Sequence, residues 1–378
     1  MDGHQVFRTP AFSYLAPVMR DIIEYLTLTR QMSGSDLHLA VGVPPATRVN
    51  GVLQPLEEAE LSPETCRELV YSVLSQSQRA RLEADFDLDF ALTVRDVGRF
   101  RGNAHFCRGN VEAAFRFVPH EVPDLASLGH GSTVEQICDS RAGLVLITGM
   151  AGMGKTTTMA AMAKRILAAR SGVMVTIEDP IEFVLQHSYA LVKQRQIGDD
   201  AKSFSAALRS ALRQDPDTII VGEMRDLETI QLALTAAETG HLVISTLHAI
   251  DAPKALDRLV DVFPADQQAQ IRAQLANALV AILSQRLLSR ADAPGRVLAS
   301  EILRVNDAVR TVIREGRVER LVGLLQIGAH EGMHTIDDSL AHLAVNGHVA
   351  LDDALAHARD PEFIKQAWAR QQAKLAKR

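Results

Sequence analysis

Short apolar runs alternate with helix-length amphipathic segments through the second half of the chain. The runs contain four to six residues and lie at 144–148, 173–177, 218–221 and 242–247. Apolar runs of this length that alternate with helices predict strands of a parallel sheet. After His248 the pattern predicts an almost wholly helical chain, with 275–288 as its most apolar helix. This part of the chain is therefore expected to be an α/β domain.

The first part of the chain has a different pattern. Apolar residues recur at helical spacing through 16–32, and a strand is expected at 37–41. The segments 47–49 and 52–53 flank Asn50-Gly51, a dipeptide typical of tight β-hairpins. These signals predict a helix followed by an antiparallel hairpin.

A second helix is expected to open at Ser62, the N-cap, with Pro63 in the first helical position and its body reaching about Ala84. Three strand-like runs follow, separated by short polar turns, at 86–94, 99–107 and 111–118. Consecutive strands joined by short turns predict a β-meander. The first part therefore reads as an α+β domain with an antiparallel sheet.

Composition shifts divide the chain into five segments. Residues 119–133 contain Pro, Gly and Ser and are expected to link two domains. The expected divisions are an N-terminal tail at 1–15, a first domain at 16–118, the linker at 119–133, a nucleotide-binding core at 134–290 and a helical C-terminal region at 291–378.

Charge and cysteine content disfavour several classes of protein function. The 378 residues carry a formal net charge of −6, which disfavours a nucleic-acid or anionic-membrane partner. The three cysteines are far apart and form no C-x-x-C pair, so neither a zinc site nor a disulfide framework is indicated. The N-terminus lacks signal-peptide features and no apolar run reaches membrane-spanning length. We expect a soluble protein of the reducing cytoplasm.

A phosphate-binding loop follows the first apolar run of the α/β part. The segment from Gly149 to Thr156 fits G-x-x-x-x-G-K-[ST], and a helix-forming run follows at once. Glycines let backbone N–H groups surround phosphates, Lys155 would reach the β and γ oxygens, and the Thr156 hydroxyl would ligate Mg²⁺. The expected nucleotide-binding residues are Gly149, Met150, Ala151, Gly152, Met153, Gly154, Lys155, Thr156 and Thr157.

Acidic residues end the next two strands. Glu178 ends the second strand in the box Thr176-Ile-Glu-Asp-Pro-Ile-Glu-Phe183, where a carboxylate could orient the water that attacks a phosphate. Glu223 follows the third strand and is the expected acid of the metal site. A solvated acidic turn would explain the first of these segments equally simply.

Histidines bracket the fourth strand, and arginines gather in the first domain. His248 follows the strand and is a candidate sensor of the γ-phosphate, and His241 precedes the strand. Either histidine could instead be a structural group. The arginines at the strands of the first domain could be solvated or could reach a nucleotide on a neighbouring subunit; they are Arg95, Arg99, Arg101, Arg108 and Arg116.

In these motifs the chain resembles the hexameric secretion ATPases of type IV pili, specifically the retraction ATPases. The resemblance extends from about residue 16 to about residue 358. It rests on four motifs in the family's order: the Walker A loop, the acidic box 176–183, the Walker B segment 221–226 and the histidine box 239–248.

The resemblance implies a PAS-like first domain, a RecA-like ATPase domain and a homo-hexameric ring with ATP and Mg²⁺ between subunits. It implies that Glu178 is the water-activating base, that Glu223 is the Walker B acid, and that Arg99 and Arg116 reach the nucleotide. It further implies a cytoplasmic protein held peripherally at the inner membrane. Its partners there would be the pilus platform protein and a paralogous pilus ATPase.

The chain departs from the family at two places. The phosphate loop reads Met-Ala-Gly-Met where the family usually has Pro-Thr-Gly-Ser, and about fifteen N-terminal residues are additional. Three other functions remain open at this point. They are a pilus-assembly or type II secretion ATPase, a non-hydrolysing partner of another hexamer, and a motor on DNA or RNA.

Overall fold

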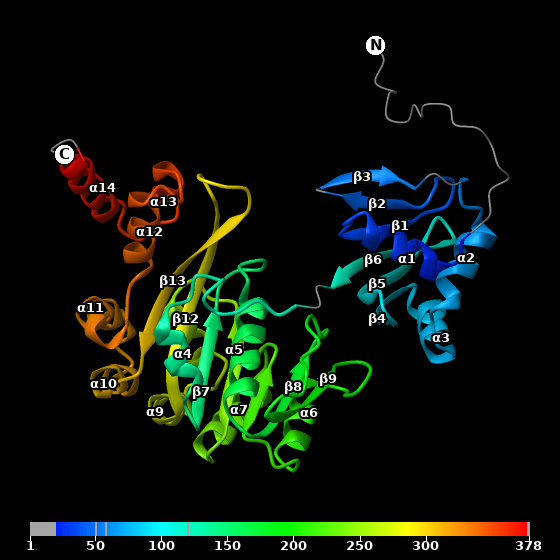
Figure 1. The fold of residues 1–378 in the computed structure, drawn as a ribbon. Coiled ribbons are helices and arrows are strands. Elements are labelled where there is room, and N and C mark those ends of the chain that lie inside the picture. Colours follow the sequence, from blue (N-terminus) through cyan, green and yellow to red (C-terminus); the bar gives the residue numbers. More distant parts are fainter. Residues whose placement is uncertain (1–19, 50, 57–58, 119–120, 376–378) are drawn as a thin grey trace. The chain divides into compact units, whose positions relative to one another are not determined.

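The computed structural model describes residues 20–49, 51–56, 59–118 and 121–375, so the expected tail at 1–15 lies outside the described residues. The chain divides into two compact units, residues 1–120 and 121–378. Figure 1 shows the helices and strands of each unit.

The first unit is an antiparallel sheet covered by helices. Its described strands run in the order β3-β2-β1-β6-β5-β4. They are β1 (Asp36–Leu39), β2 (Ala46–Val49), β3 (Val52–Pro55), β4 (Asp87–Val94), β5 (Gly98–Cys107) and β6 (Asn110–Val118). The helices are α1 (Ile22–Gln31), α2 (Pro63–Ser72) and α3 (Gln76–Asp85). The expected hairpin and meander are both confirmed.

Local capping explains the helices of this unit and corrects one expectation. The Ser62 side chain accepts the backbone N–H of Thr65, and Pro63 stands in the first turn of α2, as predicted. The prediction of a single helix reaching Ala84 was wrong, because Ser75 caps a second helix through the backbone N–H of Gln78. The segment is therefore two short helices rather than one.

The two faces of the first sheet differ in character. One face carries buried side chains such as Phe100 and Phe115, which pack with the helices in the core of this unit. Alternation along β5 places Arg99 and Arg101 on the opposite face, and Arg101 lies directly across from Arg116 of β6. Arg99, Arg101 and Arg116 therefore share the face that the core does not cover, whereas Arg95 and Arg108 lie in the turns on either side of β5.

The second unit is built on a mostly parallel sheet. Its described strands run in the order β13-β12-β7-β11-β10-β8-β9, and only the β12–β13 pair is antiparallel. They are β7 (Gly143–Thr148), β8 (Gly172–Glu178), β9 (Ala190–Gln196), β10 (Thr218–Val221), β11 (Leu242–Leu247), β12 (Leu279–Ser289) and β13 (Arg296–Arg304).

The helices of the second unit lie on both faces of the sheet or follow it. They are α4 (Ser132–Cys138), α5 (Lys155–Ala169), α6 (Phe204–Ala211), α7 (Leu227–Glu238), α8 (Ala252–Asp261), α9 (Gln268–Ala278), α10 (Asp307–Glu315), α11 (Leu321–Ile327), α12 (Ile336–Val345), α13 (Leu351–Ala356) and α14 (Pro361–Leu375). Short 3-10 turns flank α11 at Val318–Arg320 and Gly328–Glu331. Within the part of the chain that the structure describes, no helix is long and apolar enough to cross a bilayer.

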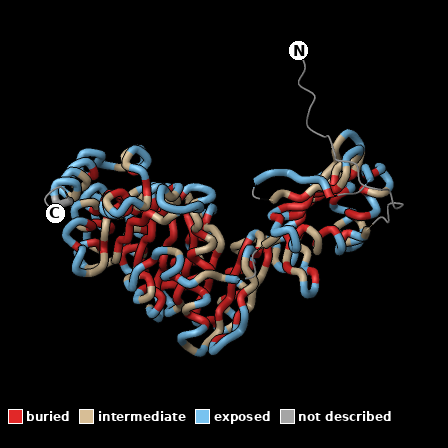
Figure 2. The backbone as a smooth tube through the Cα atoms, turned by 45° about the horizontal axis from the view of Figure 1, so that its top comes forward, coloured by how far each residue is buried: buried red, intermediate tan, exposed pale blue. Residues whose placement is uncertain are grey.

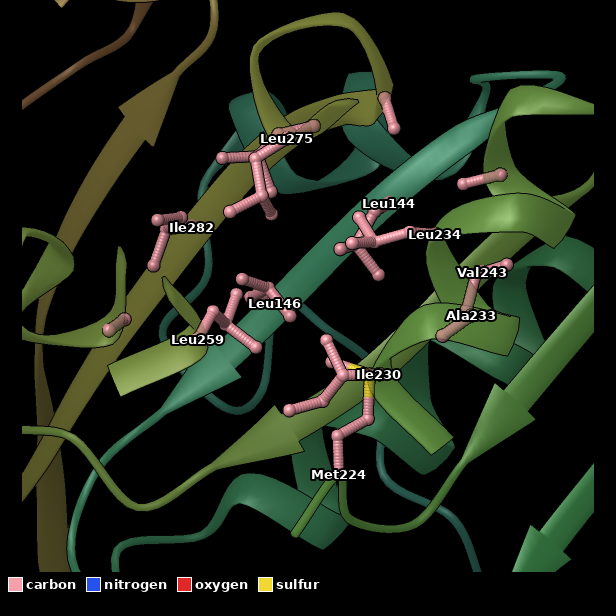
Figure 3. Packing of buried hydrophobic residues seen from close by; sticks show 14 of the residues in the cluster. Leu144, Leu146, Met224, Ile230, Ala233, Leu234, Val243, Leu259, Leu275 and Ile282 are labelled. Carbon is pink, nitrogen blue, oxygen red and sulfur yellow. The ribbon is translucent and has the colours of Figure 1, made fainter. Parts of the chain in front are cut away.

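Alternate residues of the central strands enter two separate cores. Leu144 and Leu146 of β7 pack with the core on the side of α6 to α9 (Figure 3). Val145 and Ile147 pack on the other side, with α4 and α5. Figure 2 shows buried positions following the strands of this sheet. Burial on both faces explains why these strands read as continuous apolar runs.

The stretch expected to be the most apolar helix, 275–288, is mostly strand. The helix α9 ends at Ala278, and β12 runs on from Leu279 between β7 and β13. β12 is nearly fully buried, so its sequence shows no two-residue alternation to separate it from a buried helix. The expectation of a helical region from 291 is also wrong at β13, which pairs along its whole length with β12.

Two further features of this unit were not foreseen. β9 was not predicted as a strand and lies at the edge of the sheet beside β8. In the expected linker, Leu125 is buried against α4 and α5, and the Lys164 side chain of α5 donates to the Val122 carbonyl oxygen at 2.8 Å. The described part of this segment, from residue 121, therefore packs on the second unit.

Candidate active site

The phosphate loop joins the end of β7 to the start of α5. Gly152 and Gly154 both have positive φ, at 77° and 79°, which glycine adopts without steric cost. Gly154 is the N-cap of α5 and no side chain caps the helix. The first N–H groups of α5 therefore lack a side-chain cap, which suits a helix start that receives phosphates.

Lys155 is held against the loop that precedes it. Its ammonium donates to the carbonyl oxygens of Gly149 and Met150 at 2.8 and 2.9 Å. Burial lowers the pKa of this amine, and the nearby carboxylates of Glu223 and Glu182 oppose that shift. The charge therefore sits at the loop before any phosphate arrives.

Contacts with β12 and β13 fix the unusual loop. A Cβ on Gly149 would lie 2.7 Å from the carbonyl oxygen of Gln285, so only glycine fits there. The sulfur of Met153 accepts the backbone N–H of Leu287 at 3.3 Å. Arg296 donates to the Gly152 carbonyl oxygen at 3.2 Å. Met153 thus ties the loop to the sheet, while the Met150 side chain is exposed.

Glu178 ends β8 as a buried carboxylate with two donors. The Thr176 hydroxyl and the Gln194 amide both donate to its Oε1 atom, at 2.6 and 3.0 Å. Burial raises the pKa of this carboxyl above its ordinary value, the two hydrogen bonds oppose that shift, and the Glu182 charge adds to it. A buried carboxylate with a raised pKa is well suited to accept a proton.

Glu223 follows β10 and contacts Arg225 and His248. Its Oε2 atom lies 2.7 Å from Arg225, and its Oε1 atom lies 3.4 Å from Nε2 of His248, which follows β11. Partial burial would raise the pKa of Glu223, but the hydrogen bond from Arg225 and the charges of His248, Arg225 and Lys155 together lower it. Glu223 is therefore held as an anion beside the phosphate loop.

These groups meet at one edge of the sheet. β7, β8, β10 and β11 are parallel neighbours, so their carboxyl ends lie together. The electrostatic interactions of Lys155 with Glu223 and Glu182 place the phosphate loop and both acidic segments within reach of one another. The structure thus brings together Lys155, Glu178, Glu223 and His248, which are far apart in the sequence.

His241 lies at the other end of β11. It precedes the strand, and its Nδ1 atom is 2.9 Å from the carbonyl oxygen of Ala236 at the end of α7. It closes the turn between that helix and the strand. The structure therefore assigns His241 a structural contact away from the phosphate loop.

Arg116 and Arg99 belong to the first unit. Arg116 donates to Oδ1 of Asp36 at 2.8 Å, while most of its side chain is exposed. Burial would raise the pKa of the Asp36 carboxyl, but its hydrogen bonds to Ser35 and Arg116 and the Arg116 charge lower it. Arg99 lies two residues from Arg101 on the same uncovered face. Their part in a nucleotide site remains a prediction.

Sequence reasoning missed three side chains of this site. Gln194 contacts Glu178 from β9, Arg225 pairs with Glu223, and Arg296 holds the phosphate loop. Arg225 lies two residues after Glu223, so the sequence alone could have suggested it as a partner of this acid. Gln194 and Arg296 carry no local signal, because their partners are distant in the sequence.

The donor set fits a Mg²⁺–nucleotide. The loop offers backbone N–H groups and a lysine for phosphates, and Thr156, in the first turn of α5, is a hydroxyl ligand of the kind Mg²⁺ takes. Glu223 provides an ionised carboxylate on the neighbouring strand end. Hard oxygen ligands of this kind match Mg²⁺ when the substrate phosphates supply the remainder.

Comparison with known proteins places this geometry in a family. Residues 48–316 match the family model described as "Type II/IV secretion system protein". The chain is 43% identical to the type IV pilus retraction ATPase PilT of Pseudomonas aeruginosa over 342 residues, which are 90% of this chain and 99% of that protein. It is 38% identical to the type IV pilus ATPase PilU of the same organism, over 88% of this chain and 87% of that protein.

The fold comparison agrees. The crystal structure of the pilus retraction motor PilT with bound ADP superposes with a TM-score of 0.87 at 42% identity, covering 92% of this chain and 100% of that chain. The similarity therefore includes both units and the site between the strand ends and α5. The chain belongs to the type II/IV secretion system family, among the type IV pilus retraction ATPases.

Proposed function

We propose that this protein is the ATP-hydrolysing motor that retracts a type IV pilus and so drives twitching motility. The observation that carries the proposal is the meeting of Lys155, Glu178, Glu223 and His248 at one sheet edge. The sequence similarity to retraction ATPases over nearly the whole chain supports pilus retraction as the process that this ATPase drives.

Each residue has a distinct role in the proposed reaction. The uncapped N–H groups of α5 and the Lys155 ammonium bind the β and γ phosphates. Glu178 orients the attacking water and accepts its proton, for which its buried, donor-stabilised carboxylate is suited. The His248 side chain contacts Glu223. In this proposal, the presence or absence of the bound phosphate is sensed at the end of β11 through that contact.

Thr156 and Glu223 would hold Mg²⁺, directly or through water. When bound, the ion would neutralise charge that develops on the phosphate oxygens. The chain's own part is to keep Glu223 ionised and to place the Thr156 hydroxyl at the start of α5.

The working assembly in this proposal is a homo-hexamer in which the first unit of one subunit completes the site of the next. The arginines Arg99 and Arg116 would supply the cationic groups that stabilise the transferred phosphate. We propose a PAS-like fold for the first unit and a RecA-like fold for the core of the second. The ring would lie on the cytoplasmic side of the inner membrane, against the pilus platform protein, with a paralogous pilus ATPase as a further partner.

Deletion of the gene tests this function against the alternatives. Loss of a retraction motor should leave cells piliated but immobile, because pili still assemble. Bald cells would instead identify an assembly ATPase. Piliated, immobile cells that a Lys155→Ala copy restores to twitching would identify a non-hydrolysing partner.

A further inference from the structure

Glu178 receives side-chain hydrogen bonds from two different strands. Thr176 belongs to β8, the strand that Glu178 ends, and Gln194 belongs to β9 at the edge of the sheet. The parallel register places Thr176 directly across from Gln194. Both donors therefore reach the same carboxylate oxygen, Oε1, from one side.

Two further partners determine which way the Gln194 amide points. Its Oε1 atom accepts the backbone N–H of Leu185 at 2.7 Å, and its Nε2 atom donates to the carbonyl oxygen of Phe183 at 2.9 Å. Reversing the amide would set an NH₂ group against an N–H and an oxygen against two acceptors. The NH₂ group of Gln194 therefore faces Glu178.

The same amide holds the loop that carries the acidic box. Phe183 and Leu185 lie in the segment between β8 and β9, and His187 in that segment accepts the backbone N–H of Val192 at 3.1 Å. Gln194 thus links the loop, the edge strand and the carboxylate. Fixing a group through several partners is how a reactive carboxylate is held in one orientation.

Resting on the proposed role of Glu178 as base, we propose that Gln194 is the positioning residue that aims this carboxylate and stabilises its anionic form by donating a hydrogen bond to it. Gln194 acts through Glu178. No described contact of Gln194 involves the phosphate loop.

The charge balance at this edge explains why a donor is needed. Burial and the Glu182 charge both raise the pKa of Glu178, so without its donors the carboxyl would hold a proton at higher pH. Other titratable and charged groups at this edge include Asp179 in the acidic box, Lys155 on α5, Glu223 and Arg225 after β10, and His248 after β11. The amide of Gln194 is a neutral donor that stabilises the anion without adding a competing cation.

The test is the pH dependence of ATP hydrolysis in a single turnover of the full-length protein with Mg²⁺. Single-turnover rates isolate the chemical step from product release. In Gln194→Leu the acid limb should move up by about one pH unit, as expected for loss of a hydrogen bond to a charged acceptor. At high pH the rate should return toward wild type.

Two further variants sharpen the result. When ionised, the side chain in Gln194→Glu can still accept from Leu185 but cannot donate, and it adds a negative charge, so the acid limb should move at least as far as in Gln194→Leu. His187→Ala is the matched control, because it removes a hydrogen bond between the same loop and β9 without removing a donor to Glu178. Its acid limb should stay where the wild-type limb lies.

A uniform loss of rate at all pH values in both Gln194 variants would overturn the proposal and leave the amide a structural group. An acid limb that moves equally in His187→Ala would do the same. Glu178→Gln separates this inference from the proposed function. If Glu178→Gln abolishes turnover while Gln194→Leu and Gln194→Glu leave the limb unmoved, only the role of Gln194 is wrong. If Glu178→Gln retains turnover, the role of Glu178 falls and that of Gln194 with it.

Discussion

The Nε2 atom of His248 lies 3.4 Å from the Oε1 atom of Glu223, so one side-chain pair joins the ends of the adjacent strands β11 and β10. Three residues beyond His248, Asp251 caps α8 and pairs with Arg359 of the C-terminal region at 3.1 Å. Arg359 also lies 3.4 Å from the buried carboxylate of Glu301 on β13. Side-chain and backbone contacts thus extend from Glu223 through His248 and Asp251 to Arg359, which lies between α13 and α14.

Removing the His248 side chain should slow ATP hydrolysis without weakening ATP binding. His248→Ala should lower kcat about tenfold, a typical coupling effect, with KM nearly unchanged. The control is His241→Ala at the opposite end of β11, which contacts Ala236 and should keep normal turnover. Equal losses in the two variants, measured by steady-state ATPase assays, would contradict a sensor role.

Variants of Glu178 and Glu223 should differ in how their ATP binding depends on Mg²⁺ concentration. Glu178→Gln should bind ATP with ordinary Mg²⁺ dependence and trap it, because the amide keeps the shape but accepts no proton. Glu223→Gln should weaken the Mg²⁺ dependence of binding, because it removes the ionised carboxylate beside the loop. Identical titrations for both variants and wild type, followed with a fluorescent nucleotide, would show that the roles are wrongly assigned.

Mixing variants should reveal a site shared between subunits. Lys155→Ala and Arg116→Ala should each be nearly inactive alone, and mixed rings should recover part of the activity. A mixed interface can pair an intact loop with an intact arginine, since the two residues belong to different units. Arg95→Ala, at an exposed turn, serves as the control and should stay active alone. No recovery on mixing would indicate a site built within one chain.

The arginines of α10 should matter for motility more than for hydrolysis. Val309, Val312 and Ile313 are buried in the core of the second unit, while Arg314 is exposed and donates to Asn277. The double variant Arg310→Ala with Arg314→Ala should keep ATPase activity and assembly but abolish twitching. As a contrast, Ile313→Ala should cost about 2–5 kcal/mol of stability by leaving a cavity.

Loss of hydrolysis in proportion to motility in the arginine variant would instead make α10 part of the catalytic core. The measurement is therefore paired, with ATPase rate and twitching zone recorded for the same variant.

The buried His130 should make stability depend on pH. Burial and the nearby His334 lower the pKa of His130 to about 4, and its Nε2 atom lies 3.0 Å from the Thr158 hydroxyl. Below the ordinary value of 6.5 the unfolded chain takes up a proton that the folded protein refuses until about pH 4. The free energy of unfolding should therefore fall as pH drops through this window.

His130→Gln should remove the part of that dependence due to His130, so the fall in the free energy of unfolding across this window should be smaller by up to about 3 kcal/mol. Urea unfolding followed by the fluorescence of the single tryptophan, Trp368 on α14, reports on the second unit. Parallel pH profiles for the variant and the wild type would show that His130 is charged, or exposed, in the folded protein.

Elements whose signals are local could be predicted from the amino-acid sequence alone. The hairpin at Asn50-Gly51, the Ser62 cap and the strand–loop–helix unit around Lys155 each depend on residues within a few positions of one another. The order of the strand-end motifs also placed Glu178, Glu223 and His248 at one sheet edge, because parallel strands end on the same side.

Features that depend on partners distant in the sequence emerged only in the folded protein. The stretch that became β12 is apolar on both faces, so its period could not separate strand from helix until β7 and β13 paired with it. Gln194 gained its contact with Glu178 only when β9 aligned with β8, across sixteen residues of chain. A hydrogen bond between strands depends on register, and register is set by packing of the whole sheet rather than by either residue.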